Sequence, residues 1–557
     1  MTFNLEKYEY IPVLPAAANA IFLSLVAGLL VTVLCFFIPI TGWHMDQPVT
    51  VPVPVLLEMI QNVIRYRSID ELGYDIAGDV GFRAGGIALA MLVAGLAGYE
   101  ITNSATIPVD RRTHYSGRQL LAGRRAKKAA ARELLSKSGG EKHAPNLAPG
   151  LLWPRAWQVL NLLVLGAIGS GKTRILLGLL EGLLAQARQK GKDCGLFIYD
   201  ATGEILSGLP VDDSEIAVIS SGDGSGFGWA MSRDIKSVSD CESVAAQRAR
   251  TIKEAGLWEK GAATLDAGAM VLCGIEHQSW SAPELYEMSL TDPVQLKGLW
   301  EKHYPPAAKL IEIDPDSGTL SRTSASFLIT WRANVLRTLR PLAEAWKKLP
   351  PEKQFAFGGW LHGGVRQPKI VVLPRNGRHP EISAAWIAMA LDAIAGHLGD
   401  PALPVSQTRL RTFVIDEAPT LGRLERWPEI LNTGRNKGIS TIAVCQDLTQ
   451  FRQTYGDAAK SILQRFRLKI IGEQTPGPDA TEIAEEWIGQ RKIQDWSLAR
   501  KRDGHIEQPA VEEVPIVPSE HLSDRLGVKN GAVHALLVGL KQIYQLEWPI
   551  TVWVRRR

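Results

Sequence analysis

The sequence predicts an α/β fold that is interrupted by an all-helical domain and preceded by two apolar helices. Three observations predict it. A strand-like apolar run is followed at once by a glycine-rich loop and a helical stretch, an order typical of α/β sheets. Much of the middle of the chain has helical periodicity instead. Near the start of the chain, twenty successive residues carry no charge.

The composition is that of a globular protein. Apolar residues make up 46% and charged residues 22% of the 557 residues, so the chain can bury large cores and is not disordered. The formal net charge of +4 is small for this length, and it neither requires nor excludes a nucleic-acid partner. The five cysteines show no paired spacing, which excludes a disulfide or zinc framework and suits a reducing cytoplasm.

Two apolar runs predict a membrane hairpin. Residues 21–40 form a run that, at ~1.5 Å per residue, crosses a bilayer core of roughly 30 Å. Residues 85–99 form a shorter second run, bounded by Arg83 and Glu100. A signal peptide is the alternative for the first run, but acidic residues stand where such a peptide needs basic ones. A buried helix of a soluble domain is the alternative for the second.

The charges around these runs are distributed unevenly. Besides the bounding Arg83, six acids and two arginines lie between the runs: Asp46, Glu58, Asp70, Glu71, Asp75 and Asp79 against Arg65 and Arg67. Nine basic residues follow the second run: Arg111, Arg112, Arg118, Arg124, Arg125, Lys127, Lys128, Arg132 and Lys137. Because Lys and Arg collect on the cytoplasmic side, we expect two spans in residues 1–104 with a small periplasmic loop between them. The basic segment, residues 105–150, is then a cytoplasmic linker, whose charges either contact anionic lipid headgroups or form a solvated helical face.

A phosphate-binding loop is predicted from residue 166. Residues 159–165 predict a buried strand and residues 175–183 a helix, and between them stands the pattern GxxxxGK followed by Thr. The residues of this pattern are Gly166, Ala167, Ile168, Gly169, Ser170, Gly171, Lys172 and Thr173. Their backbone N–H groups and the helix N-terminus suit phosphate oxygens. We expect ATP here, with Lys172 on the β- and γ-phosphates and the Thr173 hydroxyl on Mg²⁺.

An acidic pair completes the predicted site. Residues 411–415 predict a second buried strand that ends in Asp416 and Glu417. A carboxylate at the end of such a strand, opposite a phosphate-binding loop, is where Mg²⁺ is held, so we assign Asp416 to the metal. Glu417 is then the general base that polarises the attacking water. The alternative is a pair of acids that opens a loop or a helix.

Two further residues are candidates for catalysis. Residues 440–445 predict a strand that ends in Gln446, which either reports on the γ-phosphate or is a polar residue that opens a loop. Arg435 follows Glu417 by eighteen residues, with no acid within a helical turn of it. It is either a surface arginine or an arginine finger that reaches a neighbouring subunit's site. Residues 195–199 predict another strand, which ends in Asp200 with Glu204 shortly after, and no role follows for these two acids.

The distance between the motifs predicts an inserted domain. Lys172 and Asp416 lie 244 residues apart, which is too far for a minimal nucleotide-binding core. We expect helices at residues 242–258, 264–275, 283–290 and 324–346, and strands at residues 369–373, 467–472, 533–539 and 542–548. The expected domains are a nucleotide-binding domain in two parts, residues 151–238 and 355–557, interrupted by an all-helical domain, residues 239–354. Residues 138–150 have the composition of a linker.

The ordered set of motifs resembles the type IV coupling proteins, the TraD/TrwB-like inner-membrane ATPases of conjugation and type IV secretion. The segments that carry the resemblance run in order along the chain: HYSGRQLLAG (114–123), GAIGSGKT (166–173), FIYDATGEI (197–205), FGWAMSRDI (227–235), FVIDEAPTLGRL (413–424), TGRNKGIS (433–440), VCQDLTQFRQTYG (444–456) and VPIVPSEHL (514–522). GRQLLAG and the C-terminal portion match only loosely. The resemblance implies a RecA-like nucleotide domain, an inner-membrane anchor and a homohexameric ring with a central channel. It also implies that Arg435 completes a neighbouring subunit's site and that Gln446 is the glutamine that follows it in the family.

Several functions remain open at this level. The first is an ATP-driven motor that delivers single-stranded DNA with its attached relaxase to a type IV secretion channel. The second is a docking ATPase that recruits effector proteins to such a channel. A chromosome-partition translocase of the FtsK type would need more spans and a sequence-reading tail, and a membrane protease would need a motif such as HExxH, which the sequence lacks.

Overall fold

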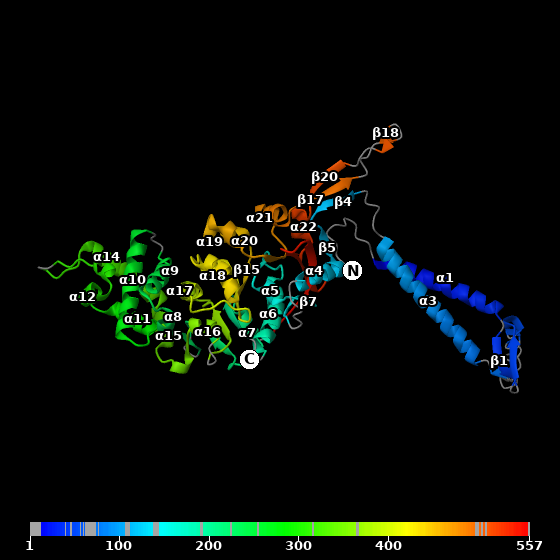
Figure 1. Ribbon diagram of the computed structural model, residues 1–557, viewed down its shortest axis with the longest axis horizontal. Helices are drawn as coiled ribbons and strands as arrows, with labels where there is room; N and C mark the ends of the chain where they lie inside the picture. Colours follow the sequence, from blue (N-terminus) through cyan, green and yellow to red (C-terminus); the bar gives the residue numbers. More distant parts are fainter. Residues whose placement is uncertain are drawn as a thin grey trace. The chain divides into compact units, whose positions relative to one another are not determined.

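The computed structural model describes residues 13–38, 40–44, 47–55, 57–58, 61, 74–75, 77–105, 112–136, 144–189, 193–222, 226–252, 256–314, 317–363, 367–495, 501–502, 505–506 and 510–554. These residues form two compact units (Figure 1). The first unit contains residues 7–115 and 492–512, and the second contains residues 116–491 and 513–557. Between the two apolar runs, Asp46, Arg65, Arg67, Asp70 and Glu71 lie outside the described residues, as do residues 137–143 of the expected linker.

The first unit is built on two long helices that pack antiparallel, α1 (Val13–Phe37) and α3 (Ala77–Ala105). The Ser24 hydroxyl donates to the carbonyl oxygen of Met91 at 2.8 Å. Arg83 donates to the carbonyl oxygens of Cys35 (2.7 Å), in the last turn of α1, and of Ile38 (2.8 Å), just after it, where carbonyl groups have no intrahelical partner. These two pairs show that the helices are antiparallel, because residue 24 contacts residue 91, whereas residue 35, further along α1, contacts residue 83, earlier in α3.

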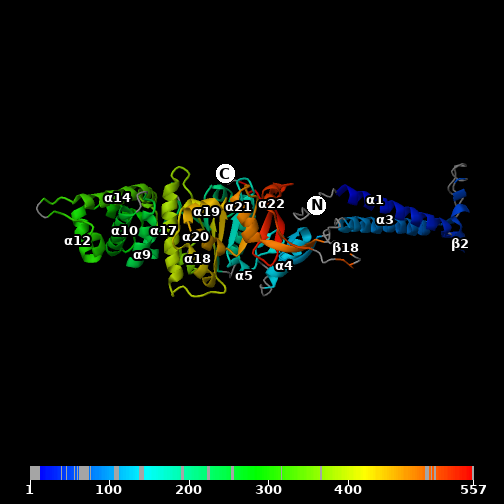
Figure 2. The ribbon, with the colours of Figure 1, turned by 90° about the horizontal axis from the view of Figure 1, so that it is seen from above.

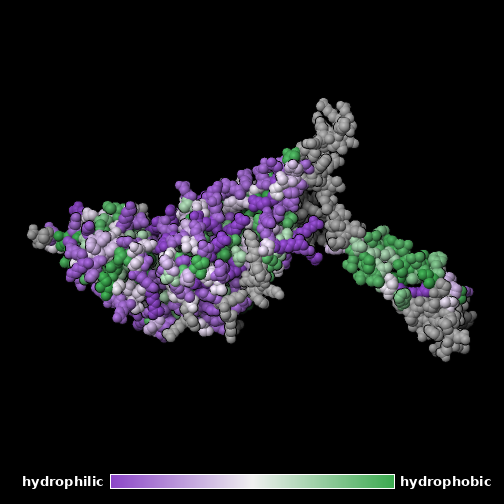
Figure 3. Space-filling view, in the orientation of Figure 1, coloured by the Kyte–Doolittle hydropathy of each residue, from purple (hydrophilic) through white to green (hydrophobic). Residues whose placement is uncertain are grey.

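Small residues let the two helices approach. A Cβ atom added to Gly95 would lie 2.4 Å from the Ser24 Oγ, and one added to Gly28 would lie 2.8 Å from the Met91 side chain. Close packing at small residues is typical of helices that associate in a bilayer. The outward faces are apolar and exposed, as Figure 3 shows in green, with Phe22 64% and Leu92 59% exposed. Residues 82–99 of α3 are long and apolar enough to cross a membrane, and α1 contains a shorter apolar segment, residues 20–35.

Short strands accompany the helices. One sheet has the order β2-β1-β3, another has the order β20-β17-β4, and β18 pairs with β19. Their bounds are β1 (Ile40–His44), β2 (Gln47–Val51), β3 (Tyr74–Asp75), β4 (Arg112–Gly117), β17 (Gln490–Asp495), β18 (Lys501–Arg502), β19 (His505–Ile506) and β20 (Ala510–Pro515).

The second unit is organised around one large sheet with the strand order β10-β13-β9-β14-β15-β8-β16-β22-β23-β5 and with β21 beside β22. The seven strands from β10 to β16 are parallel, and β22 pairs antiparallel with both β16 and β23. The bounds are β5 (Leu120–Ala122), β8 (Leu162–Leu165), β9 (Cys194–Asp200), β10 (Ile216–Val218), β13 (Ile370–Pro374), β14 (Leu410–Ile415), β15 (Ile439–Cys445), β16 (Leu468–Ile471), β21 (Gly527–Lys529), β22 (Ala532–Val538) and β23 (Ile543–Pro549). The strands expected in this unit from the sequence are therefore present.

Both faces of the sheet are covered, so its parallel strands are apolar throughout. Successive residues of β8 alternate between the faces: Leu162 and Val164 belong to one core, Leu163 and Leu165 to the other. The first core contains α6 (Lys172–Arg188) and the inner side of α4 (Gly123–Leu135). The second core contains α17 (Pro380–Gly399), α18 (Trp427–Thr433) and α19 (Leu448–Tyr455).

Shorter elements connect the strands. They are β6 (Asn146–Ala148), β7 (Leu151–Leu152), α5 (Arg155–Gln158), α7 (Glu204–Gly208), α16 (Phe357–Leu361), η2 (Ala418–Leu421), η3 (Gly434–Lys437), α20 (Ala458–Gln464), α21 (Pro478–Glu482), the π-helix Ile483–Ile488 and α22 (Ser519–Asp524). The sequence predicts none of the elements in residues 120–152.

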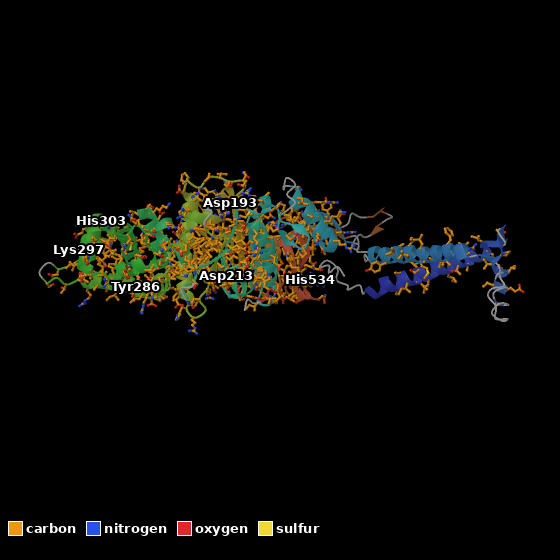
Figure 4. The ribbon with its side chains drawn as sticks, turned by 90° about the horizontal axis from the view of Figure 1, so that it is seen from below. Asp193, Asp213, Tyr286, Lys297, His303 and His534 are labelled. Atoms are coloured by element: carbon orange, nitrogen blue, oxygen red, sulfur yellow. The ribbon has the colours of Figure 1, made fainter. Side chains whose placement is uncertain are left out.

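The middle of the chain forms the helical insertion. Its helices are α9 (Val238–Ala249), α10 (Leu257–Glu276), α11 (Ala282–Leu290), α12 (Pro293–His303), α13 (Pro305–Ala308), α14 (Arg322–Thr338) and α15 (Arg340–Trp346). Tyr286, Lys297 and His303 mark α11 and α12 in Figure 4. The single helix expected over residues 242–258 is wrong, because α9 ends at Ala249 and Gly256 stands at φ 104° before α10 begins. The helix expected over residues 324–346 is likewise two helices, and Pro341 stands near the start of the second.

The insertion joins the sheet through a buried neck. The chain enters through β11 (Gly228–Trp229) and α8 (Met231–Asp234) and returns through η1 (Pro351–Lys353) and β12 (Gln354–Phe355), which pairs parallel with β11. At the neck, Asp234 accepts hydrogen bonds from the Trp229 indole (2.7 Å) and from the backbone N–H groups of Phe357 and Gly358 (2.8 Å each). His397 of α17 lies 3.1 Å from the same carboxylate. One buried acid therefore ties together both ends of the insertion and the helix behind them.

Helix α17 stands between the insertion and the sheet, as Figure 2 shows in yellow-green. Its composition and length also suit a membrane span, but most of its surface is buried inside the unit. It packs on α9 of the insertion and on α18 of the sheet layer. We therefore assign it as a core helix.

Candidate functional site

The glycine-rich loop connects the carboxyl end of β8 to the start of α6. Gly169 and Gly171 have φ of 81° and 91°, a region that other residues rarely adopt. A Cβ atom added to Gly171 would also lie 2.6 Å from a Val533 methyl group. The loop is anchored where the Ala167 N–H donates to the carbonyl oxygen of Glu473 at 2.7 Å. It thus curls tightly around the N-terminus of α6, where the first N–H groups have no intrahelical partner.

Lys172 reaches back over this loop. Its Nζ donates to the carbonyl oxygens of Gly166 (2.7 Å) and Ala167 (2.9 Å). Burial lowers the pKa of Lys172, and the negative charges of Glu417 and Asp416 oppose that change. The ammonium is thus held at the mouth of the loop, within electrostatic reach of both acids.

Asp416 and Glu417 follow β14, which lies two strands away from β8 in the sheet. Strand β14 pairs with β15 so that Ile415 lies beside Ala443, and β15 pairs with β8 so that Cys445 lies beside Leu165. Residue 417 is therefore at the level of Leu165, two strand spacings or roughly 10 Å from it along the sheet. Long side chains cover this distance. The carboxylates and the Lys172 ammonium consequently face the same space beyond the carboxyl edge of the sheet.

The two acids differ in environment. The carboxyl group of Asp416 is buried, and burial, followed by the neighbouring carboxylates of Asp200 and Glu417, raises its pKa to about 7. Burial also raises the pKa of Glu417, while a hydrogen bond from Gln446 and the charge of Lys172 oppose this change. The backbone of Glu417 is left-handed, at φ 52°, which turns the chain sharply at the end of β14. An unfavourable conformation at such a position is typical of functional sites.

Gln446 follows β15, the strand that lies between β8 and β14. It is half-buried and donates a hydrogen bond to Glu417. A side chain at this point can contact both the base and a phosphate that the loop holds. The structure therefore brings together Lys172, Asp416, Glu417 and Gln446 at the carboxyl edge of the sheet.

Asp200 and Glu204 gain specific contacts in the structure. The carboxylate oxygens of Asp200 accept from the backbone N–H groups of Gly203 and Leu206 at 2.8 Å each, which shapes the turn into α7. Glu204 forms an ion pair with Arg174, the residue after Thr173, at 3.0 Å. These acids support the site from the neighbouring strand, and the sequence gives no signal for either contact.

Arg435 lies elsewhere. It belongs to η3, which precedes β15, so it stands at the amino edge of the parallel sheet, whereas the other four residues stand at the carboxyl edge. Seven residues of β15 at ~3.3 Å each separate the two edges. The Arg435 side chain is exposed, and within the described part of the chain its guanidinium makes no hydrogen bond or ion pair. It therefore does not contribute to the site of its own subunit in this structure.

The residues present fit a magnesium nucleotide. Oxygen ligands such as a carboxylate and a hydroxyl suit Mg²⁺, which needs only one or two protein carboxylates when phosphates supply the rest. Among the described residues, no group of three or more His, Cys, Asp or Glu residues is arranged to hold a metal unaided. The buried oxygens Glu417 Oε1 and Ser170 Oγ have no protein partner, which leaves both available to a ligand.

The C-terminal segment passes along the outer side of α6. Arg174 donates to the carbonyl oxygen of Thr551 at 3.4 Å, and the Trp553 indole donates to Glu181 at 3.1 Å. Gly208 of α7 makes room for this segment, because a Cβ atom there would lie 2.7 Å from the Cβ of Trp553. The helix that begins at the phosphate-binding loop is thus supported on its outer face by residues 551–553.

Comparison with known proteins agrees with this architecture. Residues 148–504 match the family described as the type IV secretion-system coupling protein DNA-binding domain. The coupling protein TraD of Escherichia coli (strain K12) is 22% identical over 343 residues, which are 60% of this chain and 44% of TraD. The chain thus spans less than half the length of this relative.

Solved structures show the same fold. The bacterial conjugative coupling protein TrwBdeltaN70, in an unbound form, is 18% identical, with a TM-score of 0.62 over 80% of this chain and 95% of that protein. The plasmid coupling protein TrwB in complex with ADP and Mg²⁺ is also 18% identical, with a TM-score of 0.61 over 80% of this chain and 96% of that protein. This likeness confirms the predicted RecA-like α/β domain with an all-α domain.

Proposed function

The chain belongs to the type IV secretion-system coupling proteins, and from that premise we propose that it is an ATPase that drives DNA transfer through a type IV secretion channel. The observation that supports it best is the convergence of Lys172, Asp416, Glu417 and Gln446 at one edge of the sheet. TrwB, which has the same fold, has been solved with ADP and Mg²⁺ and with the ATP analogue ADPNP.

In the proposed reaction, water attacks the γ-phosphorus of ATP, the bond to the leaving ADP oxygen breaks, and Glu417 accepts the proton of the water. Lys172 binds the β- and γ-phosphate oxygens and balances the charge that develops on them. Gln446 orients the Glu417 carboxylate and contacts the γ-phosphate. Mg²⁺, held by Asp416 and the Thr173 hydroxyl, supplies further charge neutralisation.

Arg435 is assigned to a neighbouring subunit. Its exposed position at the opposite edge of the sheet from its own site supports the arginine-finger role, which requires a ring of subunits. We propose a homohexamer with a central channel, in which Arg435 of each subunit completes the site of the next. A finger of this kind stabilises transition-state charge and is worth up to ~10³–10⁵ in rate.

The hairpin of α1 and α3 is the proposed membrane anchor. Its exposed apolar surface and its close packing at Gly28 and Gly95 support two spans of the inner membrane. The excess of Lys and Arg after α3 supports a cytoplasmic location for the second unit. The proposed cargo is single-stranded DNA with its relaxase, and the proposed partners are the relaxosome and the channel components.

The test measures ATP hydrolysis by the full chain in proteoliposomes and conjugative transfer in cells. Lys172→Ala should abolish both without loss of membrane insertion. Lys348 is an exposed lysine of the helical insertion, and Lys348→Ala should leave both intact. Transfer that survives Lys172→Ala would end the motor proposal. Single-stranded DNA should stimulate hydrolysis. A lack of stimulation, together with tight binding of effector proteins, would favour a docking ATPase instead.

A further inference from the structure

Helix α4 presents a basic face whose five cations are exposed in the part of the chain that the structure describes. Its inner side, Ala126, Ala130 and Leu134, is fully buried against the sheet layer, where it packs beside β5, β7 and β23 (Figure 1). The Trp157 indole donates to the carbonyl oxygen of Leu134 at 3.1 Å and fixes the end of the helix. The apolar side of α4 is thus used by the fold, and only the polar side is left for a partner.

Cations dominate the outward side, where Leu135 is also exposed. Five cations stand on it, all exposed: Arg124, Arg125, Lys127, Lys128 and Arg132. No described carboxylate pairs with any of them. The single acid of α4, Glu133, is held inward by the Lys541 backbone N–H (2.9 and 3.0 Å) and the Tyr544 hydroxyl (3.1 Å). Its charge therefore does not neutralise the outward face.

This arrangement is unfavourable for an isolated helix. Arg124 stands three and four residues before Lys127 and Lys128, and Lys128 stands four before Arg132, so like charges are neighbours along one face. Two of the cations also occupy the first turn, which has no acid, although the helix dipole favours negative charge there. An anionic surface against this face would offset both the repulsion between the cations and their unfavourable interaction with the helix dipole.

We propose that the α4 basic face binds the anionic phospholipid headgroups of the membrane that the hairpin spans, which rests on the proposed membrane anchor. Only seventeen residues, 106–122, connect the end of α3 to Gly123, and a chain of this length reaches at most roughly 60 Å. Clusters of four to eight Lys and Arg residues close to a span are suited to anionic lipid. Single-stranded nucleic acid is a poorer match, because α4 has no aromatic side chain on which bases stack.

Lysine acetylation rates test the proposal on the full chain. The protein is placed in nanodiscs of pure phosphatidylcholine or of phosphatidylcholine with phosphatidylglycerol, and modification of each lysine is followed by mass spectrometry. Lys127 and Lys128 should react at least threefold more slowly in the anionic discs. Lys302, on the helix that carries Lys297 and His303 in Figure 4, and Lys348 should react equally in both. At 0.5 M salt the difference should vanish, since the Debye length then falls to about 4 Å.

Charge variants provide the matched control. Arg124→Gln/Arg125→Gln/Arg132→Gln should remove the protection of Lys127 and Lys128, whereas Lys302→Gln/Lys309→Gln/Lys348→Gln, which removes the same charge from the helical insertion, should preserve it. Equal rates in the two disc types would overturn the proposal. Protection by a thymidine oligonucleotide in neutral discs, without protection by phosphatidylglycerol, would overturn it in favour of a nucleic-acid surface. Failure of the protein to co-elute with discs would instead count against the membrane anchor.

Discussion

Asp416 and Asp200 occupy the same level of two neighbouring parallel strands, and the Asp416 N–H donates to the carbonyl oxygen of Tyr199, the residue before Asp200, at 3.1 Å. The two carboxyl groups differ in their partners. Burial raises the pKa of Asp200, although the hydrogen bonds that it accepts from the N–H groups of Gly203 and Leu206 favour its ionised form. Burial, followed by the neighbouring carboxylates of Asp200 and Glu417, raises the pKa of Asp416 to about 7. The pairing of these two strands thus brings Asp200 close enough to influence the titration of Asp416.

The first prediction concerns pH. Since the folded pKa of Asp416 is about 7, against 3.8 normally, its contribution to stability is complete below about pH 4 and is lost as the pH rises through 7. The melting temperature of the nucleotide-free wild type should therefore fall relative to that of Asp416→Asn between pH 5 and 8. Asp457→Asn, an exposed acid, should follow the wild type. A constant difference between wild type and Asp416→Asn would refute the raised pKa.

Arg435→Ala should lower ATP turnover by about 10³-fold or more while nucleotide binding persists, because its side chain lies away from its own phosphate-binding loop. Asn436→Ala, its exposed neighbour on the same turn, is the control. Mixing Arg435→Ala subunits with Lys172→Ala subunits should restore part of the activity, since some interfaces then combine an intact loop with an intact arginine. Mixed rings without activity would place Arg435 outside the neighbour's site.

Gln446→Ala should reduce kcat by about 10²-fold with little change in nucleotide affinity, because its hydrogen bond orients Glu417 and the phosphates are held mainly by the loop. Gln450→Ala, one turn into α19, serves as the control. Steady-state kinetics measures the change in kcat, and nucleotide titration measures the affinity. A loss of affinity equal to the loss of kcat would show that Gln446 supports binding and not the chemical step.

The packing of residue 553 on α7 can be tested by a double-mutant cycle. Gly208→Ala places a methyl group 2.7 Å from the Trp553 Cβ atom and should destabilise the protein by about 1–2 kcal/mol. Trp553→Gly, which removes this Cβ atom together with the ring, should cost a similar amount or more. The double variant should lose less than the sum, because the clash disappears when the Cβ atom is removed. Chemical denaturation of the detergent-solubilised chain measures all three, and strict additivity would contradict the contact.

Asp234→Ala should destabilise the neck by roughly 3 kcal/mol, because four donors would lose their common acceptor inside the protein. Asp234→Asn keeps the shape and part of the bonding and should cost less. Proteolysis should show the helical insertion becoming susceptible first in the alanine variant. Equal resistance of the insertion and the sheet to proteolysis would argue against the role of Asp234 in holding the two ends of the insertion together.

Local pattern was sufficient to predict eight strands of the large sheet, but not β5, β10 or β21. An apolar run that ends in glycines or in paired acids specifies both an element and its chemistry, so Lys172, Asp416, Glu417 and Gln446 are found together as expected. The contacts of Asp200 were beyond reach, because its proximity to Asp416 exists only once β9 and β14 pair. Nothing in the order of residues along the chain announces that pairing.

Among the helices that the sequence did not predict, α17 and α4 were missed for opposite reasons. Helix α17 is apolar nearly all round, since it is buried between the insertion and the sheet, so it lacks the one-sided pattern of a surface helix. The apolar pattern of α4 is hard to detect for a different reason. Two of its three buried side chains are the alanines at 126 and 130, and charged residues surround them in the sequence. In both cases, the environment that defines the helix comes from segments distant in sequence.

The strand pairing at the neck of the insertion limits how the chain can be shortened. Strands β11 and β12 run in the same direction, with Gly228 beside Gln354 and Trp229 beside Phe355. Two parallel neighbours cannot be joined by a tight turn, and a crossover of about a dozen residues or more is needed to bring the chain back to the same end. A shortened variant without residues 230–353 would therefore require a designed bridge of at least that length, and a direct splice would break the pairing that closes the core.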